Sequence, residues 1–358
     1  MGQTYRKQEQ EPASEDVIEV APGILRMQLP ISMPGLGHVN CYALIDGEGV
    51  ALVDPGLPGE ASWNALLDRL RKAEIPLERV HTAIVTHSHP DHYGGSTQLH
   101  EEVGAEILTH ESFESFSAEA NDDLGAAALD MTDEEIVEHW KARMEREPTP
   151  WGTRREAPPD EALIRYIRDG ARDGRRFLTP QPTIRVGDNA PLTFARREWF
   201  TLHTPGHTVD HLCLWDPEGG VLLSGDHVLP TITPHISGST ELGDPLAAFF
   251  ASLDRVAALD GVTTVLPAHG HPLDEAAHRC DHIKVHHEER LDVLREAADG
   301  LGDAPVDEWM KILFRERSWG GMAASETFAH LEHLRVLGEA ATRRDAEGLL
   351  HYEINTPT

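Results

Sequence analysis

The feature that most constrains this chain is a cluster of metal-binding side chains that directly follows an apolar run at residues 83–85. Within six positions the cluster holds three histidines and one aspartate, namely His87, His89, Asp91 and His92. A strand that ends here would deliver alternate residues to one side, so His87 and His89 can converge on one metal ion. Asp91 and His92 would lie on the following turn, within reach of a second ion. Because buried polar groups without partners are costly, packing does not explain the cluster, and the pattern predicts a metal site.

Further candidate residues lie at the ends of other strand-like runs. The chain has 22 histidines, so isolated histidine pairs are expected by chance, and the prediction depends on these additional positions. Four apolar or β-branched runs each end in a turn that contains glycine or proline. Glycine lets the backbone turn sharply close to a metal centre. These turns carry Asp54, His207, Asp226 and His269.

Together, these motifs resemble those of the metallo-β-lactamase superfamily, in the same order, over roughly residues 18 to 285. The resemblance implies an α/β fold of the α+β type, an αββα sandwich with a two-metal site at one edge of the paired sheets. It implies that the first ion is held by His87, His89 and His207. It implies that the second is held by Asp91, His92 and His269, with Asp226 bridging both ions. Asp54 would not bind metal but would brace a ligand loop through hydrogen bonds.

The ligand set constrains the chemistry. Imidazoles and carboxylates without thiolates suit Zn²⁺, Fe²⁺ or Mn²⁺, and we expect two divalent metal ions with Zn²⁺ as the first choice. A hydroxide between two cations is a nucleophile at neutral pH, because the pKa of the bound water falls to about 7. The chain contains no G-x-S-x-G motif, which argues against a serine hydrolase.

Catalytic roles are assigned to Asp91, Tyr93 and His235. Tyr93 directly follows the histidine cluster and could protonate the leaving group or line the pocket. His235 lies in the loop after the predicted bridging carboxylate and is expected to face the substrate. Two further histidines that adjoin strands are expected to be buried or to lie behind the ligands, namely His211 and His227.

These expectations describe a dinuclear metallohydrolase that cleaves a carbonyl substrate. A thioester, ester or lactone fits, and a small acyl-thioester is the first choice. The main alternative is a metal-dependent endoribonuclease or phosphodiesterase. Against it, 61 acidic and 31 basic residues give a formal charge of −30, which repels polyanions such as nucleic acids. Hydrolysis of β-lactams, a mononuclear iron persulfide dioxygenase and a non-catalytic metal-binding scaffold are further alternatives.

Composition indicates a cytoplasmic enzyme. No run of about 18 apolar residues is present, which argues against a membrane-spanning helix. The first residues lack the apolar segment of a secretory signal. The three cysteines, at positions 41, 213 and 280, are too few and odd in number for a disulfide framework.

The expected layout is a flexible tail at 1–16, a catalytic domain at 17–285 and a helical domain at 286–358. An insertion at about 111–185 has the pattern of acidic helices separated by a proline-rich linker. One hypothesis makes this insertion a lid whose substrate contacts are Met131, Trp140, Trp151 and Tyr166. The alternative is that these residues form the insertion's own small core.

Residues 286–358 have the pattern of amphipathic helices followed by a closing strand at 348–354. These elements resemble the winged-helix tail of the lactamase-β-2-like branch of the superfamily, whose members are described as glyoxalase-II-like hydrolases, with thioesterase and endoribonuclease examples. The third helix, expected at 326–341, is poor in Lys and Arg, which disfavours nucleic-acid binding. A role in covering the site or supporting a homodimer is favoured. A solvated helix, rather than a third metal site, is expected to carry His282, His286 and His287.

Overall fold

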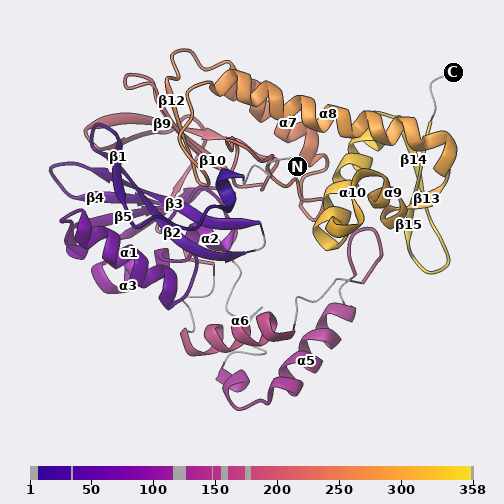
Figure 1. Cartoon of the computed structure of the whole chain (residues 1–358), viewed down its shortest axis with the longest axis horizontal. Coiled ribbons are helices and arrows are strands. Elements are labelled where there is room, and N and C mark those ends of the chain that lie inside the picture. The colour runs from indigo at the N-terminus through magenta and orange to yellow at the C-terminus, as the bar shows by residue number, and fades with distance from the viewer. Residues whose placement is uncertain are drawn as a thin grey trace, which may run out of the picture.

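Two β-sheets packed face to face form the centre of this computed structural model, which describes residues 7–33, 35–115, 126–146, 148–154, 160–173 and 179–355 (Figure 1). The first sheet has seven strands, in the order β1 (Val17–Ala21), β2 (Ile24–Met33), β3 (Leu36–Ile45), β4 (Val50–Val53), β5 (Val80–Ile84), β6 (Glu106–His110) and β7 (Ile184–Val186). The second has five, in the order β12 (Thr264–Pro267), β11 (Val221–Gly225), β10 (Leu212–Asp216), β9 (Arg197–His203) and β8 (Pro191–Phe194).

Strand direction gathers the predicted site at one edge of the sheets. β4 runs parallel to β5, and β11 runs parallel to β12. Because neighbouring parallel strands end on the same side, the turns that follow them lie close together. The turns after β4 and β5 carry Asp54 and the histidine cluster, and the turns after β11 and β12 carry Asp226 and His269. The topology therefore brings four of the sequence motifs together, two at the ends of β4 and β5 and two at the ends of β11 and β12.

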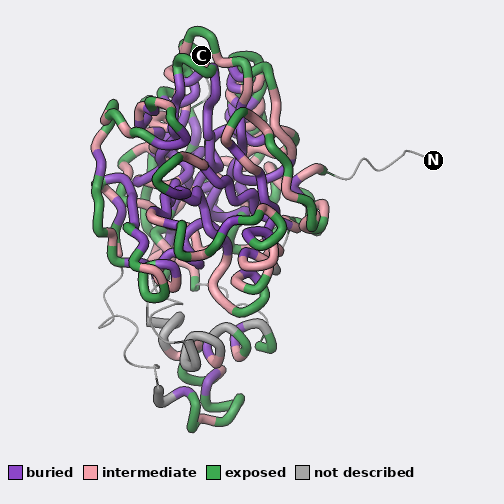
Figure 2. Tube along the Cα trace, turned by 90° about the vertical axis from the view of Figure 1, so that its left-hand side faces the viewer, coloured by how far each residue is buried: buried purple, intermediate pink, exposed green. Residues whose placement is uncertain are grey.

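Alternating side chains divide the apolar residues into layers. On β3, Tyr42 and Leu44 face the core between the sheets, whereas Cys41 and Ala43 face outward. The outer faces are covered by α1 (Glu60–Lys72) and α3 (Ser96–Val103) on the first sheet, and by α7 (Pro245–Ala257) and α8 (Ala276–Leu301) on the second. Figure 2 shows the buried chain concentrated in this body of the molecule. The layers confirm the predicted αββα sandwich.

Local sequence explains the start and the orientation of α7. The side chain of Asp244 accepts a hydrogen bond from the backbone N–H of Ala247 at 2.9 Å, which caps the first turn. Pro245 follows at the first helical positions, where its missing N–H is not needed. The buried apolar residues recur every three or four positions, at Leu246, Phe249, Leu253 and Val256. One face of the helix is thereby committed to the second sheet.

The insertion packs on itself. Its described helices are η3 (Ala126–Leu129), α5 (Asp133–Arg146) and α6 (Asp160–Asp173), which lie below the sandwich in Figure 1. Met131 and Trp140 pack against the insertion's own buried residues, as the alternative to a lid expects. Trp151 lies instead in the core next to Phe328, with ring centroids 5.3 Å apart. The side chain of Tyr166 lies outside the described residues.

Residues 7–16 are packed onto the sandwich, which corrects the expectation of a flexible tail for this part of the N-terminus. η1 (Gln8–Gln10) contains Glu9, whose side chain is fully buried. Glu9 accepts hydrogen bonds from the backbone N–H groups of Thr231 at 2.8 Å and Ile232 at 3.1 Å. Residues 1–6 lie outside the described residues. The N-terminal segment therefore helps to hold the loop that follows Asp226 in place.

The C-terminal region is continuous with the sandwich. α8 runs unbroken across the boundary that was expected at 285/286, so that boundary falls inside a helix. The later elements are β13 (Ala304–Pro305), α9 (Val306–Leu313), α10 (Gly321–Val336), β14 (Ala340–Arg344) and β15 (Leu350–Ile354). Their buried side chains share one core with β10, β11 and β12. Helices and short strands of the expected kind are present, and the winged-helix assignment stays a prediction.

Two further expectations about the helices can be compared with the structure. His287, expected on a solvated face, is fully buried, because this position of α8 faces α10. His282 is exposed and His286 is half-buried. Within the described ranges, none of the helices is both long and apolar enough to cross a membrane.

Candidate metal centre

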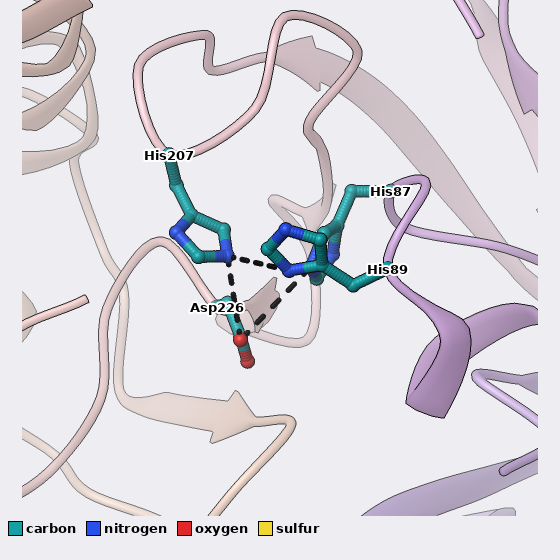
Figure 3. A group of neighbouring side chains, drawn as sticks. All are labelled: His87, His89, His207 and Asp226. Carbon is teal, nitrogen blue, oxygen red and sulfur yellow. Dashed lines mark hydrogen bonds and ion pairs between the residues drawn. The ribbon is translucent and has the colours of Figure 1, made fainter. Parts of the chain in front are cut away.

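Three histidines and one aspartate from three loops meet at one point (Figure 3). His87 Nε2 lies 3.0 Å from His89 Nδ1, and His207 Nε2 lies 3.1 Å from the same nitrogen. Asp226 Oδ2 lies 3.6 Å from His207 Nε2 and 4.0 Å from His87 Nε2. Each residue offers one ligand atom, and these atoms all lie within 4.8 Å of one another. Three ring nitrogens and a carboxylate oxygen form a donor set that suits a divalent transition metal. We refer to these four residues as the first cluster.

A glycine allows the turn that carries His207 to lie against α7. Gly206 has a φ of 138°, and a Cβ added there would lie 2.4 Å from Phe249 Cβ. Any side chain at this position would push the turn, and His207 with it, away from the helix. Phe249 also contacts His227, which is fully buried as expected.

A second cluster lies beside the first, on α2 (Pro90–Tyr93) and on the turn after β12. It consists of Asp91, His92 and His269, each at most 2% exposed. Asp91 Oδ2 lies 3.5 Å from His269 Nε2 and 3.6 Å from His92 Nε2. Four buried ligand atoms have no hydrogen-bond partner among the described residues: Asp91 Oδ2, His92 Nε2, His269 Nε2 and Asp226 Oδ1. Buried polar atoms are rarely left unpaired, and a divalent cation among them would satisfy all four, so these residues fit a metal ion.

The carboxylate of Asp226 lies between the two clusters. Its Oδ2 is 3.6 Å from the Nε2 atoms of both His207 and His92, and its Oδ1 is 3.3 Å from His269 Nε2. The backbone N–H of Asp226 donates to Nε2 of the buried His211 at 3.0 Å. Asp226 therefore occupies the place that the sequence motifs implied for a bridging ligand, and His211 lies behind it.

Asp54 contacts the second cluster from behind. Its Oδ2 accepts from His92 Nδ1 at 2.9 Å and from Thr86 Oγ1 at 2.8 Å, and its Oδ1 accepts from the Thr86 N–H at 2.9 Å. Its φ of 55° lies in the left-handed region, which aspartate tolerates better than most residues. A proton held on His92 Nδ1 leaves the lone pair of Nε2 facing the cluster.

Two other histidines are held by backbone carbonyls from distant segments. His207 Nδ1 donates to the carbonyl of His235, and His269 Nδ1 donates to the carbonyl of His38, both at 2.6 Å. Each bond fixes the ring and leaves Nε2 facing its cluster. His38 is a functional position that the sequence motifs did not reveal. A backbone carbonyl can come from any residue type, so residue patterns carry no signal for it.

Burial and neighbouring charges set the protonation states of the ligands. Burial, together with the adjacent imidazoles, holds the pKa values of His87 and His89 well below the usual range. Burial alone would raise the pKa of Asp226, but His269 and His92 hold it well below its usual value. At neutral pH His87 and His89 are neutral imidazoles and Asp226 is an ionised carboxylate, the forms that bind a metal. Burial alone would lower the pKa values of His92 and His269, but the neighbouring carboxylates raise both, so a metal ion bound at the second cluster would displace protons from these rings.

The two catalytic assignments outside the ligand set differ in their support. Tyr93 is 6% exposed and packs with Val85, Ile107 and Phe113. The side chain is therefore largely buried beside apolar residues, and its catalytic role stays a prediction. His235 lies beside the first cluster, and its side chain is 22% exposed. His235 therefore keeps its candidate role.

The fold and the two clusters define the class of protein: an αββα sandwich with adjacent His/Asp clusters at one edge of its sheets. The sequence profile of the Metallo-beta-lactamase superfamily matches residues 34–269, more than half of the chain. The chain belongs to the metallo-β-lactamase superfamily.

Known proteins are similar over most of the chain. A probable metallo-hydrolase of Bacillus subtilis is 27% identical over 266 residues, covering 73% of this chain and 73% of that protein. A hydroxyacylglutathione hydrolase of Albidiferax ferrireducens is 26% identical over 257 residues, covering 71% of this chain and 70% of that protein. Together with the paired clusters, these similarities support a metallo-hydrolase of this superfamily.

The fold similarity extends further along the chain than the sequence profile. The crystal structure of a metallo-beta-lactamase family protein from Thermus thermophilus has a TM-score of 0.72 at 29% identity and covers 94% of this chain and 100% of that one. A beta-lactamase domain protein from Burkholderia ambifaria has a TM-score of 0.72 at 26% identity and covers 96% of each chain. Coverage of this extent includes most of the helical region that follows the sandwich.

Proposed function

We propose that this protein is a dinuclear metallohydrolase that cleaves a carbonyl substrate, with acyl-thioesters as the first choice and esters and lactones next. The observation that carries the proposal is the set of four buried ligand atoms that meet no hydrogen-bond partner within the described part of the chain. With the first cluster, they provide donors for two divalent ions, Zn²⁺ first, although Fe²⁺ or Mn²⁺ suit the same donors. Ions bound there lower the pKa of water to about 7 and polarise a carbonyl.

The protein's own residues would supply position and proton transfer. Asp226 holds a negative charge between the two clusters. Asp91, buried beside His92 and His269, would accept the proton that water releases when it adds to the carbonyl. The partly exposed ring of His235 would return a proton to the leaving group. Burial of both clusters would strengthen the attraction between bound cations and the negative charge that develops on the substrate oxygen.

The choice of an acyl-thioester has two supports. The relative from Albidiferax ferrireducens acts, by its name, on a hydroxyacylglutathione, which is an acyl derivative of a thiol. The formal charge of −30 disfavours long polyanions, because binding to nucleic acid depends on neutralising phosphates with Lys and Arg. A small acyl substrate therefore fits better than RNA.

A substrate screen tests the proposal directly. The purified protein, loaded in turn with Zn²⁺, Mn²⁺ and Fe²⁺, is assayed against thioesters, esters, lactones, phosphodiesters and β-lactams. We expect hydrolysis of carbonyl substrates, two ions per chain by metal analysis, and loss of activity in His87→Ala. His278→Ala is the matched control, because this histidine is 80% exposed on α8.

Two results would contradict the proposal. One iron per chain would exclude the dinuclear centre. Turnover of phosphodiesters alone, with RNA binding that weakens steeply as salt rises, would replace it by the nuclease alternative.

A further inference from the structure

The loop whose carbonyl orients His207 rests on the C-terminal helix α10. The backbone N–H of Gly238 donates to Ser325 Oγ at 3.0 Å, and Ser237 Oγ lies 3.4 Å from the same oxygen. A Cβ added at Gly238 would lie 2.4 Å from Phe328 Cδ1, so the loop backbone lies directly on the helix. The position of this loop is therefore set by α10 as well as by the sandwich.

Glu326, the next residue on α10, contacts the same loop through His235. Its Oε2 lies 3.2 Å from His235 Nδ1, and its Oε1 pairs with Arg290 of α8. Burial alone would raise the pKa of Glu326, but the hydrogen bond with His235 and the charge of Arg290 hold it well below its usual value. The ionised carboxylate thus completes a path from Arg290 through Glu326 and His235 to His207.

We propose that Glu326 is a positioning residue for the first cluster, acting through His235 on His207; this inference rests on the proposed function. Glu326 fixes the ring of His235, and the hydrogen bonds at Ser325 fix the loop that follows it. Together they hold the carbonyl oxygen that orients His207. Groups behind a metal ligand set its ring orientation and tautomer, and their loss weakens metal binding by about 10–100-fold. The helices beyond the sandwich therefore form part of the metal centre.

A separate metal site on α8 and α10 is a weaker reading of the same residues. His287, Glu326 and His330 are buried and have ligand atoms within 4.8 Å of one another. However, Arg290 already pairs with Glu326, and its positive charge opposes a cation there. His330 Nδ1 donates to the carbonyl of Glu326 at 2.7 Å, which leaves its Nε2 to accept from His287 Nδ1 at 3.1 Å. Hydrogen bonds and one ion pair account for this group except for His287 Nε2, which has no hydrogen-bond partner among the described residues.

Zn²⁺ titration of the whole protein tests the role of Glu326. Side-chain ¹H–¹⁵N spectra of the histidine rings report binding at the two clusters separately and without any assay of turnover. In Glu326→Ala, we expect the Kd of the first cluster to rise about tenfold and that of the second cluster to stay unchanged. Glu326→Gln keeps an oxygen that can accept from His235, so we expect a smaller loss. Glu339→Ala is the matched control, because it removes another carboxylate paired with an arginine of α8, Arg295.

The outcomes separate positioning from general stability. Unchanged Zn²⁺ affinity in folded Glu326→Ala, or an equal loss in Glu339→Ala, would overturn the role of Glu326. If Glu326→Ala does not fold, Ser325→Ala loosens the same loop, and unchanged affinity there would also overturn it. A wild-type protein that binds no Zn²⁺ at either cluster would overturn the proposed function itself.

Discussion

Replacement of Asp54 by asparagine tests how strongly the second cluster depends on the residue behind it. Asparagine keeps the size of the side chain and, like aspartate, tolerates the φ of 55°. The carboxylate accepts three hydrogen bonds, two from Thr86 and one from His92. An amide accepts only through its oxygen, so its NH₂ group would replace either Oδ1, facing the Thr86 N–H, or Oδ2, facing both Thr86 Oγ1 and His92 Nδ1. Facing His92, it would move the ring proton to Nε2, the atom turned toward Asp91 and Asp226.

The size of the effect follows from this change of tautomer. A proton on Nε2 must be lost or moved before this nitrogen can bind a metal. Loss of a partner behind a ligand weakens metal affinity by about 10–100-fold, which corresponds to about 1.4–2.8 kcal/mol at 1.4 kcal/mol per tenfold change. We expect this loss at the second cluster, with the fold retained.

Competition with a chelator of known Zn²⁺ affinity measures the change in both binding constants. Asp216→Asn is the control, because Asp216 is another buried carboxylate, 1% exposed and paired with Arg197 at 2.6 Å. Asp216 is the last residue of β10, at the opposite end of this strand from the metal centre. This control should lose stability without losing Zn²⁺ affinity. Two Zn²⁺ ions bound to Asp54→Asn with wild-type affinity would refute the reasoning.

Three further predictions concern positioning, metal removal and pH. His38→Ala removes the ring that accepts from the Gly270 N–H, so the carbonyl that orients His269 should loosen and Zn²⁺ affinity should fall about tenfold at the second cluster alone; equal losses at both clusters would contradict this. Chelation of the ions should lower the thermal midpoint, since an ion present at about 1,000 times its Kd adds about 4 kcal/mol to folding; a midpoint that is the same with and without Zn²⁺ would contradict metal binding by the folded state. Burial and His330 lower the pKa of His287 to about 2, so the unfolded chain takes up a proton near pH 6.5 that the folded chain does not. This contribution to the free energy of unfolding is complete above pH 6.5 and is lost as pH falls toward 2. Between pH 7 and 5, the free energy of unfolding measured with urea should therefore fall by about 2 kcal/mol less in His287→Leu than in the wild type. The same fall in both proteins would exclude this role of His287.

The sequence was most informative about side chains that can bind metal and that directly follow a predicted strand. The sandwich was predicted from the resemblance of the ordered motifs to the metallo-β-lactamase superfamily, and strands were predicted from the apolar runs that precede His87, His207, Asp226 and His269. The structure then brings these residues into two groups of ligand atoms. Their candidate roles as metal ligands were predicted from side-chain type and from the family resemblance.

Contacts made by the backbone or across long separations were not predictable. The carbonyls of His38 and His235 orient ligands, but any residue could supply them. Glu326 lies 91 positions from His235, and no local pattern links the two residues. The burial of Glu9 depends on N–H groups more than 200 positions away, so a short polar segment looked like a free tail. The contact of Trp151 with Phe328 was expected by neither hypothesis about the insertion, because 177 positions separate the two residues.

The unbroken helix α8 ties the sandwich and the C-terminal elements into one folding unit. Its 26 residues span about 39 Å, and their buried side chains lie in a single apolar core with β10–β12, α9 and α10. Unfolding of either half would expose apolar surface of the other half to water, so we expect neither half to remain folded alone. We therefore expect one cooperative transition by calorimetry rather than two. Heat or denaturant should then abolish the metal centre and the helical region in the same step.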